Sequence, residues 1–237
     1  MSDRRCLCLA LAALLLGGAA WTGNTAEPAE GRIAGLVRYT GTVPADQVIP
    51  TTDGGMIRHN DLVVDAKTKG LRHVAAVLED APAQPKAEKA KPAVIDQRDM
   101  VFVPRMISIQ HGQAVRFENN DLCNHSVMGI STSKANQFNT VAGPGQPISR
   151  VFELQKHPVK IGCALHGWMA AWVVVVPHPW FAVSDELGKF EIGNVPPGKY
   201  MLVLSHPDTG LQERQMVVVE AGKTALVKVD WEKAPGK

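Results

Sequence analysis

The stretch that decides the fold is Cys163-Ala-Leu-His166-Gly-Trp-Met169, in which a thiol, an imidazole and a thioether fall close together. Short runs rich in β-branched and apolar residues flank it, at 158–163 and 171–176. Such runs, bounded by Gly, Pro, Asn or Asp, are typical of strands. The stretch is therefore predicted to form a loop that joins two neighbouring strands.

A second polar segment, 119–127, follows a predicted strand at 113–118 and contributes the imidazole of His125. Two His, one Cys and a weakly bound axial Met are the ligands of trigonal copper sites that transfer electrons. Thiolate and thioether suit Cu(I), and imidazole suits copper generally. Zinc also accepts one Cys and two His, but Met is a poor zinc ligand and 163–169 contains no Asp or Glu. The residue types therefore predict one mononuclear copper site.

The segment 94–177 resembles the small blue-copper proteins, the cupredoxins. The Cys-x2-His-x2-Met spacing is similar to that of amicyanins, whereas plastocyanins usually have a longer gap between His and Met. Residues 100–104 and 109–119 resemble the strand, glycine turn and strand that precede the first histidine ligand of the family. The resemblance implies a Greek-key β-sandwich with one type 1-like copper site. Its ligands would be His125, Cys163, His166 and Met169.

Two positions depart from the family pattern. The family usually has Asn directly after the first ligand histidine, whereas this chain has Ser126 there and Asn124 before the histidine. Because hydrogen bonds around the ligands tune a metal site, the reduction potential of the family does not carry over. Cys123 lies two residues before His125, so its side chain either points the same way as the ligand or pairs with Cys163. A Cys123–Cys163 disulfide would consume the thiolate and leave a metal-free secreted β-sandwich.

The N-terminus predicts an exported protein. Arg4 and Arg5 precede the apolar run 6–16, and small residues follow, which is the pattern of a secretory signal peptide over 1–26. The apolar run is too short to span a bilayer comfortably. We therefore expect a periplasmic or secreted protein with no stable membrane insertion after signal cleavage.

Composition and motifs exclude several functions. Lys+Arg 25 against Asp+Glu 23 leaves a formal charge of +2, which gives no basic field for nucleic acid. Many short strands with Gly 21 and Pro 16 favour an all-β fold. No GxSxG, HExxH, P-loop or dinucleotide-binding fingerprint is present, so we expect no enzyme activity. Solvated or locally hydrogen-bonded roles are expected for the remaining histidines, His59, His73, His111, His157, His178 and His206.

The segments on either side of the copper loops resemble a second family. Residues 31–39 are similar to the first strand, and 183–200 to the second half, of carboxypeptidase-regulatory-like domains, which are transthyretin-like β-sandwiches. Neither flank alone offers enough strands to bury a core, which predicts one sandwich split by the copper domain. The rival arrangement is two or three independent small domains. The expected division is a signal peptide at 1–26, the first part of the sandwich at 31–80, a linker at 81–93, the cupredoxin copper domain at 94–177 and the second part of the sandwich at 180–231.

Together these features predict a periplasmic carrier of single electrons. All four coordination positions of the copper would be filled by side chains, which disfavours oxidation of a substrate at the metal. Redox partner proteins would dock transiently near His166, at the solvent edge of the site. The resemblance to amicyanins suggests amine (methylamine) oxidation as one circuit. The alternative is a copper-binding, storage or interaction module without turnover.

Overall fold

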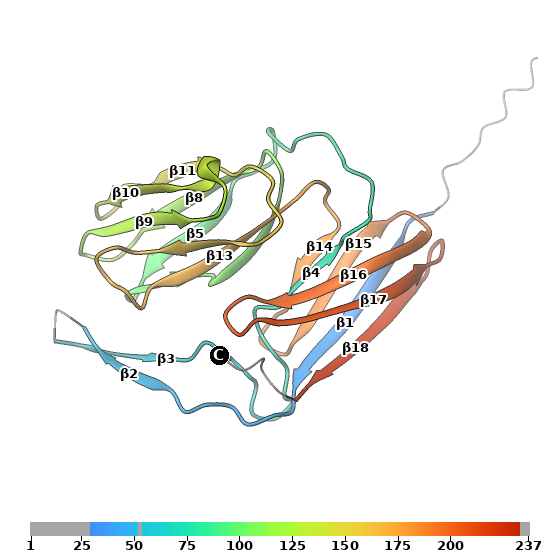
Figure 1. The fold of residues 1–237 in the computed structure, drawn as a ribbon, viewed down its shortest axis with the longest axis horizontal. Coiled ribbons are helices and arrows are strands. Elements are labelled where there is room, and N and C mark those ends of the chain that lie inside the picture. The colour runs from blue at the N-terminus through green and yellow to red at the C-terminus, as the bar shows by residue number, and fades with distance from the viewer. Residues whose placement is uncertain (1–28, 52–53, 233–237) are drawn as a thin grey trace, which may run out of the picture.

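The structure is a computed structural model that describes residues 29–51 and 54–232. Within these ranges the regular elements are β-strands and one 3-10 helix, Lys134–Asn136, which confirms the predicted all-β class (Figure 1). Among the described residues, no helix is long and apolar enough to cross a membrane. The predicted signal peptide at 1–26 lies outside the described residues.

Two sheets made from both ends of the described chain form one β-sandwich, which we call the first sandwich (Figure 1). The strands between 93 and 176 form the second sandwich. The three-stranded sheet has the order β15 (Lys189–Val195), β1 (Gly31–Tyr39), β18 (Thr224–Trp231). The four-stranded sheet has the order β14 (Phe181–Val183), β4 (Ala75–Leu78), β16 (Gly198–His206), β17 (Leu211–Val219). Side chains of both sheets pack in a single apolar cluster that runs from Ile33 to Trp231.

Strand β1 explains why the two flanks fold together. Its alternating pattern buries Ile33, Val37 and Tyr39 in the core. It pairs antiparallel with β15 and parallel with β18, and among the described strands it pairs with none of the segment 93–176. Pairing with that segment alone would have excluded a split sandwich. The exact domain boundaries stay a prediction.

The segment between the two flanks forms a second pair of sheets with its own apolar cluster, which includes Phe117, Phe152 and Ile161. The five-stranded sheet has the order β10 (Phe138–Ala142), β9 (His125–Ile130), β12 (Val159–Gly162), β13 (Ala170–Val176), β7 (Met106–Gln110). The four-stranded sheet has the order β11 (Ile148–Val151), β8 (Ala114–Asn119), β5 (Ala93–Arg98), β6 (Val101–Val103).

A partly buried charge cluster joins the two parts of the molecule. Arg105 Nε donates to Asp208 Oδ2 at 2.7 Å, and Arg105 Nη2 donates to Asp61 Oδ1 at 2.8 Å. Trp172 Nε1 donates to Asp208 Oδ1 at 2.8 Å. Burial would raise the pKa of Asp208, but the hydrogen bond from Arg105 outweighs it and the pKa falls below its usual value. The carboxylate therefore stays charged and holds Arg105 in place.

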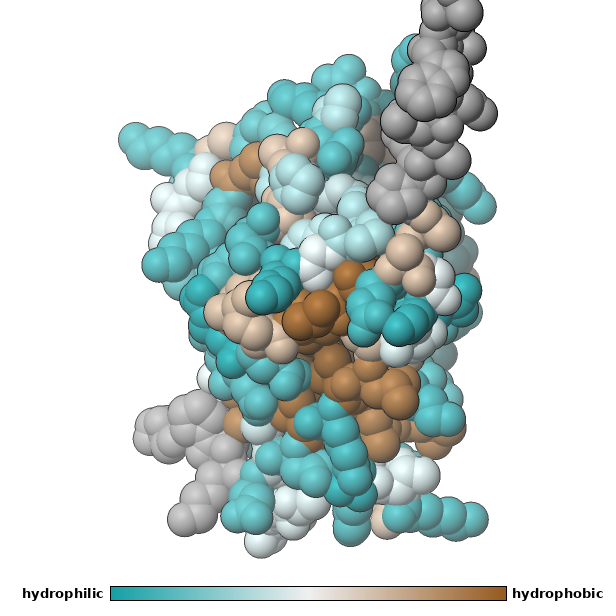
Figure 2. All heavy atoms as spheres, turned by 90° about the vertical axis from the view of Figure 1, so that its right-hand side faces the viewer, coloured by the Kyte–Doolittle hydropathy of each residue, from teal (hydrophilic) through white to brown (hydrophobic). Residues whose placement is uncertain are grey.

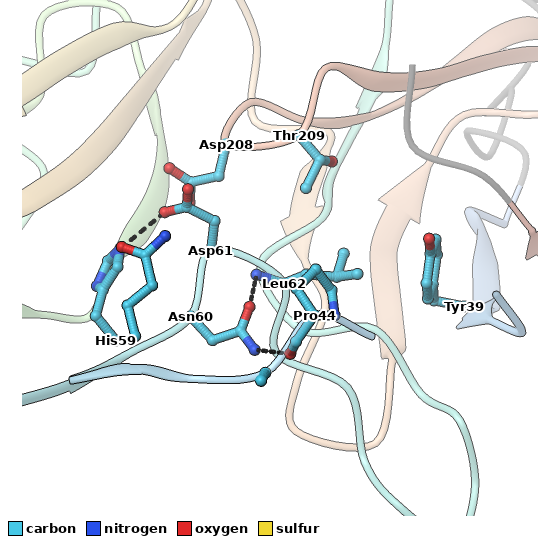
Figure 3. Close-up of a pocket in the computed structure, with 10 residues that line it drawn as sticks. Tyr39, Pro44, His59, Asn60, Asp61, Leu62, Asp208 and Thr209 are labelled. Atoms are coloured by element: carbon cyan, nitrogen blue, oxygen red, sulfur yellow. Dashed lines mark hydrogen bonds and ion pairs between the residues drawn. The ribbon is translucent and has the colours of Figure 1, made fainter. Parts of the chain in front are cut away.

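A small hairpin, β2 (Gln47–Pro50) and β3 (Met56–His59), leads into this junction. A cavity of about 310 Å³ lies between the end of the hairpin and the β16–β17 turn. Figure 3 shows Asp61 and Asp208 side by side at its wall, with His59 Nε2 2.9 Å from Asp61 Oδ1. On the other side, Asn60 Nδ2 donates to the carbonyl of Pro44 at 2.9 Å. The hairpin thus bonds to the same carboxylate cluster that joins the two sandwiches.

Apolar side chains also gather on the face of the molecule that the first sandwich forms (Figure 2). Leu226 on β18 is 84% exposed. Beside it, Ala34, Leu36 and Phe190 line a shallow groove of about 670 Å³. Because this groove belongs to the first sandwich, Leu226 is a useful control position for experiments on the second.

Replacing Arg105 with Met should destabilise the protein by about 3 kcal/mol at pH 7, because the Asp208 carboxylate is then buried without its cation. The folded pKa of Asp208 is lowered, so the stabilisation is complete above the unfolded pKa and is lost as pH falls through the folded pKa. The difference between wild type and variant should therefore shrink below about pH 4. Thermal unfolding at the two pH values measures it.

The control is Arg32→Met, which breaks the exposed pair between Arg32 and Glu191. This change should have only the small effect of an ordinary surface substitution. Equal stability losses in the two variants at pH 7 would contradict a structural role for the Arg105 cluster.

Candidate metal centre

The antiparallel pairing of β9 with β12 brings the two predicted ligand loops to one end of a sheet. His125 is the first residue of β9, and Cys163 directly follows the end of β12. His166 and Met169 lie in the loop that leads to β13 at Ala170. The loop closes on itself through a hydrogen bond from the Met169 N–H to the His166 carbonyl at 3.0 Å.

The side chains of His125, Cys163 and His166 are buried and converge. The Nδ1 atoms of the two histidines are 2.9 Å apart, and Cys163 Sγ lies 3.7 Å from His166 Nδ1. One ligand atom from each of the three residues lies within 4.8 Å of the others. Met169 is buried in the same apolar cluster as Cys163. Nowhere else in the described ranges do three or more His, Cys, Asp or Glu side chains gather in this way.

Ser126 links the two ligand loops. Its backbone N–H donates to Cys163 Sγ at 3.3 Å, and its Oγ accepts the N–H of Ala164 at 2.7 Å. Ser126 stands out in the sequence because the resembled family usually has Asn at this position. In this chain the serine forms the connection between the segment of the first histidine and the segment of the cysteine.

Asp121 is the residue near the site that the sequence analysis missed. Its Oδ2 lies 2.8 Å from His125 Nε2, and its two oxygens accept the N–H groups of Asp99 at 2.7 Å and Met100 at 3.1 Å. A carboxylate that accepts the second ring N–H of a ligand histidine fixes the tautomer and orientation of the ring. The available signal was an acid four residues before the histidine, Asp121-x3-His125.

The electrostatic surroundings favour a thiolate. Burial would raise the pKa of Cys163, but hydrogen bonds from His125 and from the N–H groups of Ser126, Leu165 and His166 outweigh it and lower the pKa from 9.0 to about 6. Burial would lower the pKa of His125, but its hydrogen bonds with Cys163 and Asp121 outweigh it and raise the pKa. At neutral pH Cys163 therefore already carries the charge that a metal ligand needs.

The surroundings of His166 are partly apolar and lie at the surface. The Trp168 ring stacks at a tilt on His166 with 5.2 Å between the ring centroids, and Trp168 Nε1 donates to the Met100 carbonyl at 3.0 Å. Leu165, next to His166, is 55% exposed. Trp168 thus supports the histidine from within the protein, whereas Leu165 faces solvent.

Cys123 and Cys163 are not joined by a disulfide. Cys163 Sγ instead accepts the Ser126 N–H, and Cys123 Sγ lies 3.5 Å from His125 Nε2. The metal-free reading based on a Cys123–Cys163 bond therefore does not describe this structure. The side chain of Cys123 points toward the ring of His125, the first of the two orientations left open by the sequence.

The remaining histidines divide into three groups. His59 and His111 form ion pairs with Asp61 and Glu153. His157 is exposed, as expected for a solvated residue. The other three are buried, namely His73, His178 and His206. Of these, His206 bonds locally to Thr209, as expected, whereas His178 bonds to the distant carbonyl of Leu78.

No protein-family model and no curated protein matches the sequence. Among solved structures, the chain is similar to a purple cupredoxin from Nitrosopumilus maritimus, with 23% identity over 35% of this chain and 99% of that chain, at a TM-score of 0.32. A copper-containing nitrite reductase from Thermus scotoductus SA-01 shows 21% identity over 42% of this chain and 25% of its own, at a TM-score of 0.34. A Cu(I) form of an amicyanin mutant shows 19% identity over 43% of this chain and 98% of its own, at 0.33. These neighbours are cupredoxins or copper proteins, and each likeness covers less than half of this chain.

The low pKa of Cys163 can be measured directly in metal-free protein that carries Cys123→Ser. The ultraviolet absorbance of the thiolate should grow with pH around a midpoint of about 6. Adding His125→Ala removes the hydrogen bond that lowers the pKa, so burial should dominate and the midpoint should rise by more than about one pH unit. Adding His111→Ala, which alters only a surface ion pair, should leave the midpoint unchanged. A midpoint near the ordinary thiol value in the Cys123→Ser protein itself would refute the assignment.

Proposed function

We propose that this chain is a type 1 copper protein that carries single electrons, with one copper ion held by His125, Cys163, His166 and Met169. The observation that carries the proposal is the convergence of two imidazole nitrogens and one sulfur, all buried, with their ligand atoms within 4.8 Å of one another. A group of this kind in an apolar core is costly to maintain unless its polar atoms are satisfied. A bound metal ion would join all three donors.

The donor set fits copper by its chemistry. It combines a thiolate, two imidazoles and a buried thioether, which is the set expected for mononuclear electron-transfer sites. Copper bound there supplies a one-electron couple between Cu(I) and Cu(II). Zn²⁺ lacks such a couple and does not favour thioether ligation.

The protein residues around the donors would keep their positions fixed. Asp121 orients the His125 ring, and the N–H of Ser126 donates to Cys163 Sγ. Because His125 belongs to β9 and Cys163 directly follows β12, the paired strands limit their movement. A rigid ligand set changes little between two oxidation states, which favours rapid electron transfer. With four positions filled by side chains, an electron carrier is favoured over an enzyme that binds substrate at the metal.

The exposed surface at Leu165, next to the buried His166, is the proposed contact for redox partner proteins. Transient electron-transfer contacts are small, so an apolar residue beside an edge ligand is suitable for them. With the leader expected at 1–26, we propose that such partners lie outside the cytoplasm. The similarity of the ligand loop to amicyanins adds amine (methylamine) oxidation as a proposed circuit.

Addition of one equivalent of Cu(II) to purified protein should produce an intense visible band from thiolate-to-copper charge transfer. Cys163→Ser should abolish the band, because the thiolate is its source. The matched control His111→Gln removes a histidine outside the cluster and should leave the band intact. A colourless wild-type protein, or a band that survives in Cys163→Ser, would refute the copper assignment.

The second candidate function is copper binding or storage without turnover, and it uses the same buried ligands. Electrochemistry separates the two candidates. An electron carrier should cycle reversibly between the oxidised and reduced states without loss of copper. A copper-storage protein should instead release the metal in one of these two oxidation states. Copper content measured before and after repeated cycles gives the answer.

If electrons leave near His166, introducing a charge at Leu165 should slow electron exchange between two copies of the protein. We expect Leu165→Lys to reduce the self-exchange rate constant by about tenfold, since two like charges would meet in the encounter. The absorption spectrum should not change. Leu226→Lys, at a more exposed apolar position on the other sandwich, is the control and should have little effect. Equal self-exchange rate constants in Leu165→Lys and wild type would show that the exchange surface does not include Leu165.

A further inference from the structure

One sulfur atom, Cys123 Sγ, lies beside His125 at the opposite ring edge from the buried cluster, and a second sulfur, Met100 Sδ, lies next to the first. His125 Nδ1 faces His166, whereas His125 Nε2 lies 3.5 Å from Cys123 Sγ. Cys123 Sγ is in turn 3.6 Å from Met100 Sδ. The thiol therefore lies within reach of both a thioether and an imidazole nitrogen, and the proposed electron carrier uses neither of these sulfurs.

The backbone holds Met100 in place from both sides. Asp99 and Met100, in the turn between β5 and β6, have φ values of 55° and 61°, which are unfavourable for residues with side chains. The Met100 N–H donates to Asp121, and its carbonyl accepts the indole N–H of Trp168. Strained backbone of this kind persists only where surrounding bonds maintain it. The position of the thioether next to Cys123 is thus determined by the fold.

The arrangement is suitable for a soft metal ion. Thiolate and thioether select Cu(I) among the common biological metals. Two sulfur atoms 3.6 Å apart can both reach one ion at metal–sulfur distances of about 2.3 Å. Met100 and Cys123 are half-buried, whereas Cys163 is buried. An ion from solvent would therefore reach this sulfur pair more easily than the Cys163 cluster.

We propose that Cys123 and Met100 form an outer site for Cu(I), and that this site receives the metal for the buried cluster. Binding releases the thiol proton of Cys123 to solvent and leaves the oxidation state of the ion unchanged. Transfer inward exchanges the bonds to Cys123 and Met100 for bonds to Cys163 and to the imidazoles of His125 and His166. The receiving role rests on the proposed function, whereas the outer site does not.

The outer site is tested in the Cys163→Ser protein with Cu(I) presented as its bicinchoninate complex. This variant should still take up Cu(I), and X-ray absorption should show two sulfur neighbours. Adding Cys123→Ser or Met100→Leu should lower the affinity for Cu(I) by about tenfold or more and remove one sulfur neighbour. Adding Met216→Leu, an exposed methionine on β17, should change neither measurement. Circular dichroism establishes that each variant is folded.

No Cu(I) uptake by folded Cys163→Ser protein, or uptake that Cys123→Ser and Met100→Leu leave unchanged, would overturn the outer site. The receiving role has a separate readout. Cys123→Ser in an otherwise natural chain should slow the loading of the buried cluster from Cu(I) by about tenfold while the final copper content of that cluster stays the same. An unchanged loading rate would overturn that role. Absence of the visible band with Cu(II) in wild-type protein refutes the proposed function and leaves the Cys163→Ser experiment interpretable.

Discussion

The candidate centre depends on the pairing of β9 with β12. Because these strands are antiparallel neighbours, the start of one and the end of the other meet at the same edge of the sheet. This is what places His125 next to Cys163, although 37 residues separate Cys163 from Ser126, the residue that bonds to its sulfur. The short loop after Cys163 then has only to turn once to bring His166 against His125. A shift of register by one residue in β9 would point its side chains to the opposite face and separate the cluster.

The surroundings of the cluster show how a polar group is kept in an apolar core. His125 is oriented at one ring nitrogen by Asp121 and faces His166 at the other. Cys163 accepts a backbone N–H, and its lowered pKa follows from hydrogen bonds that outweigh burial. Asp121 also accepts two N–H groups from the β5–β6 turn, so the same carboxylate fixes both the histidine and the position of Met100.

The parts of the structure that could be predicted are those with a local pattern. The alternation in 31–39 predicted which residues of β1 are buried. The Cys-x2-His-x2-Met spacing placed Cys163 and His166 in one loop, and the resemblance to the cupredoxins added His125, which the structure brings beside them. The hairpin β2–β3 was not predicted, because its exposed Val48 and Met56 give no pattern of burial.

Long-range polar contacts were also beyond the reach of local patterns. Arg105 meets Asp208 across 103 positions of sequence, and nothing near either residue indicates the other. Burial of His73, His178 and His206 was missed for the same reason, since it depends on strands that pair far along the chain.

The parallel pairing of β1 with β18 has a consequence for the order in which the protein folds. Strand β1 is the first of the described strands to be synthesised. One of its two neighbours in the sheet, β18, is the last of them. The first sandwich therefore stays incomplete until β18 has been made. The strands of the second sandwich lie between 93 and 176 and are all available earlier. We therefore expect the second sandwich, which holds the Cys163 cluster, to fold before β18 completes the first sandwich.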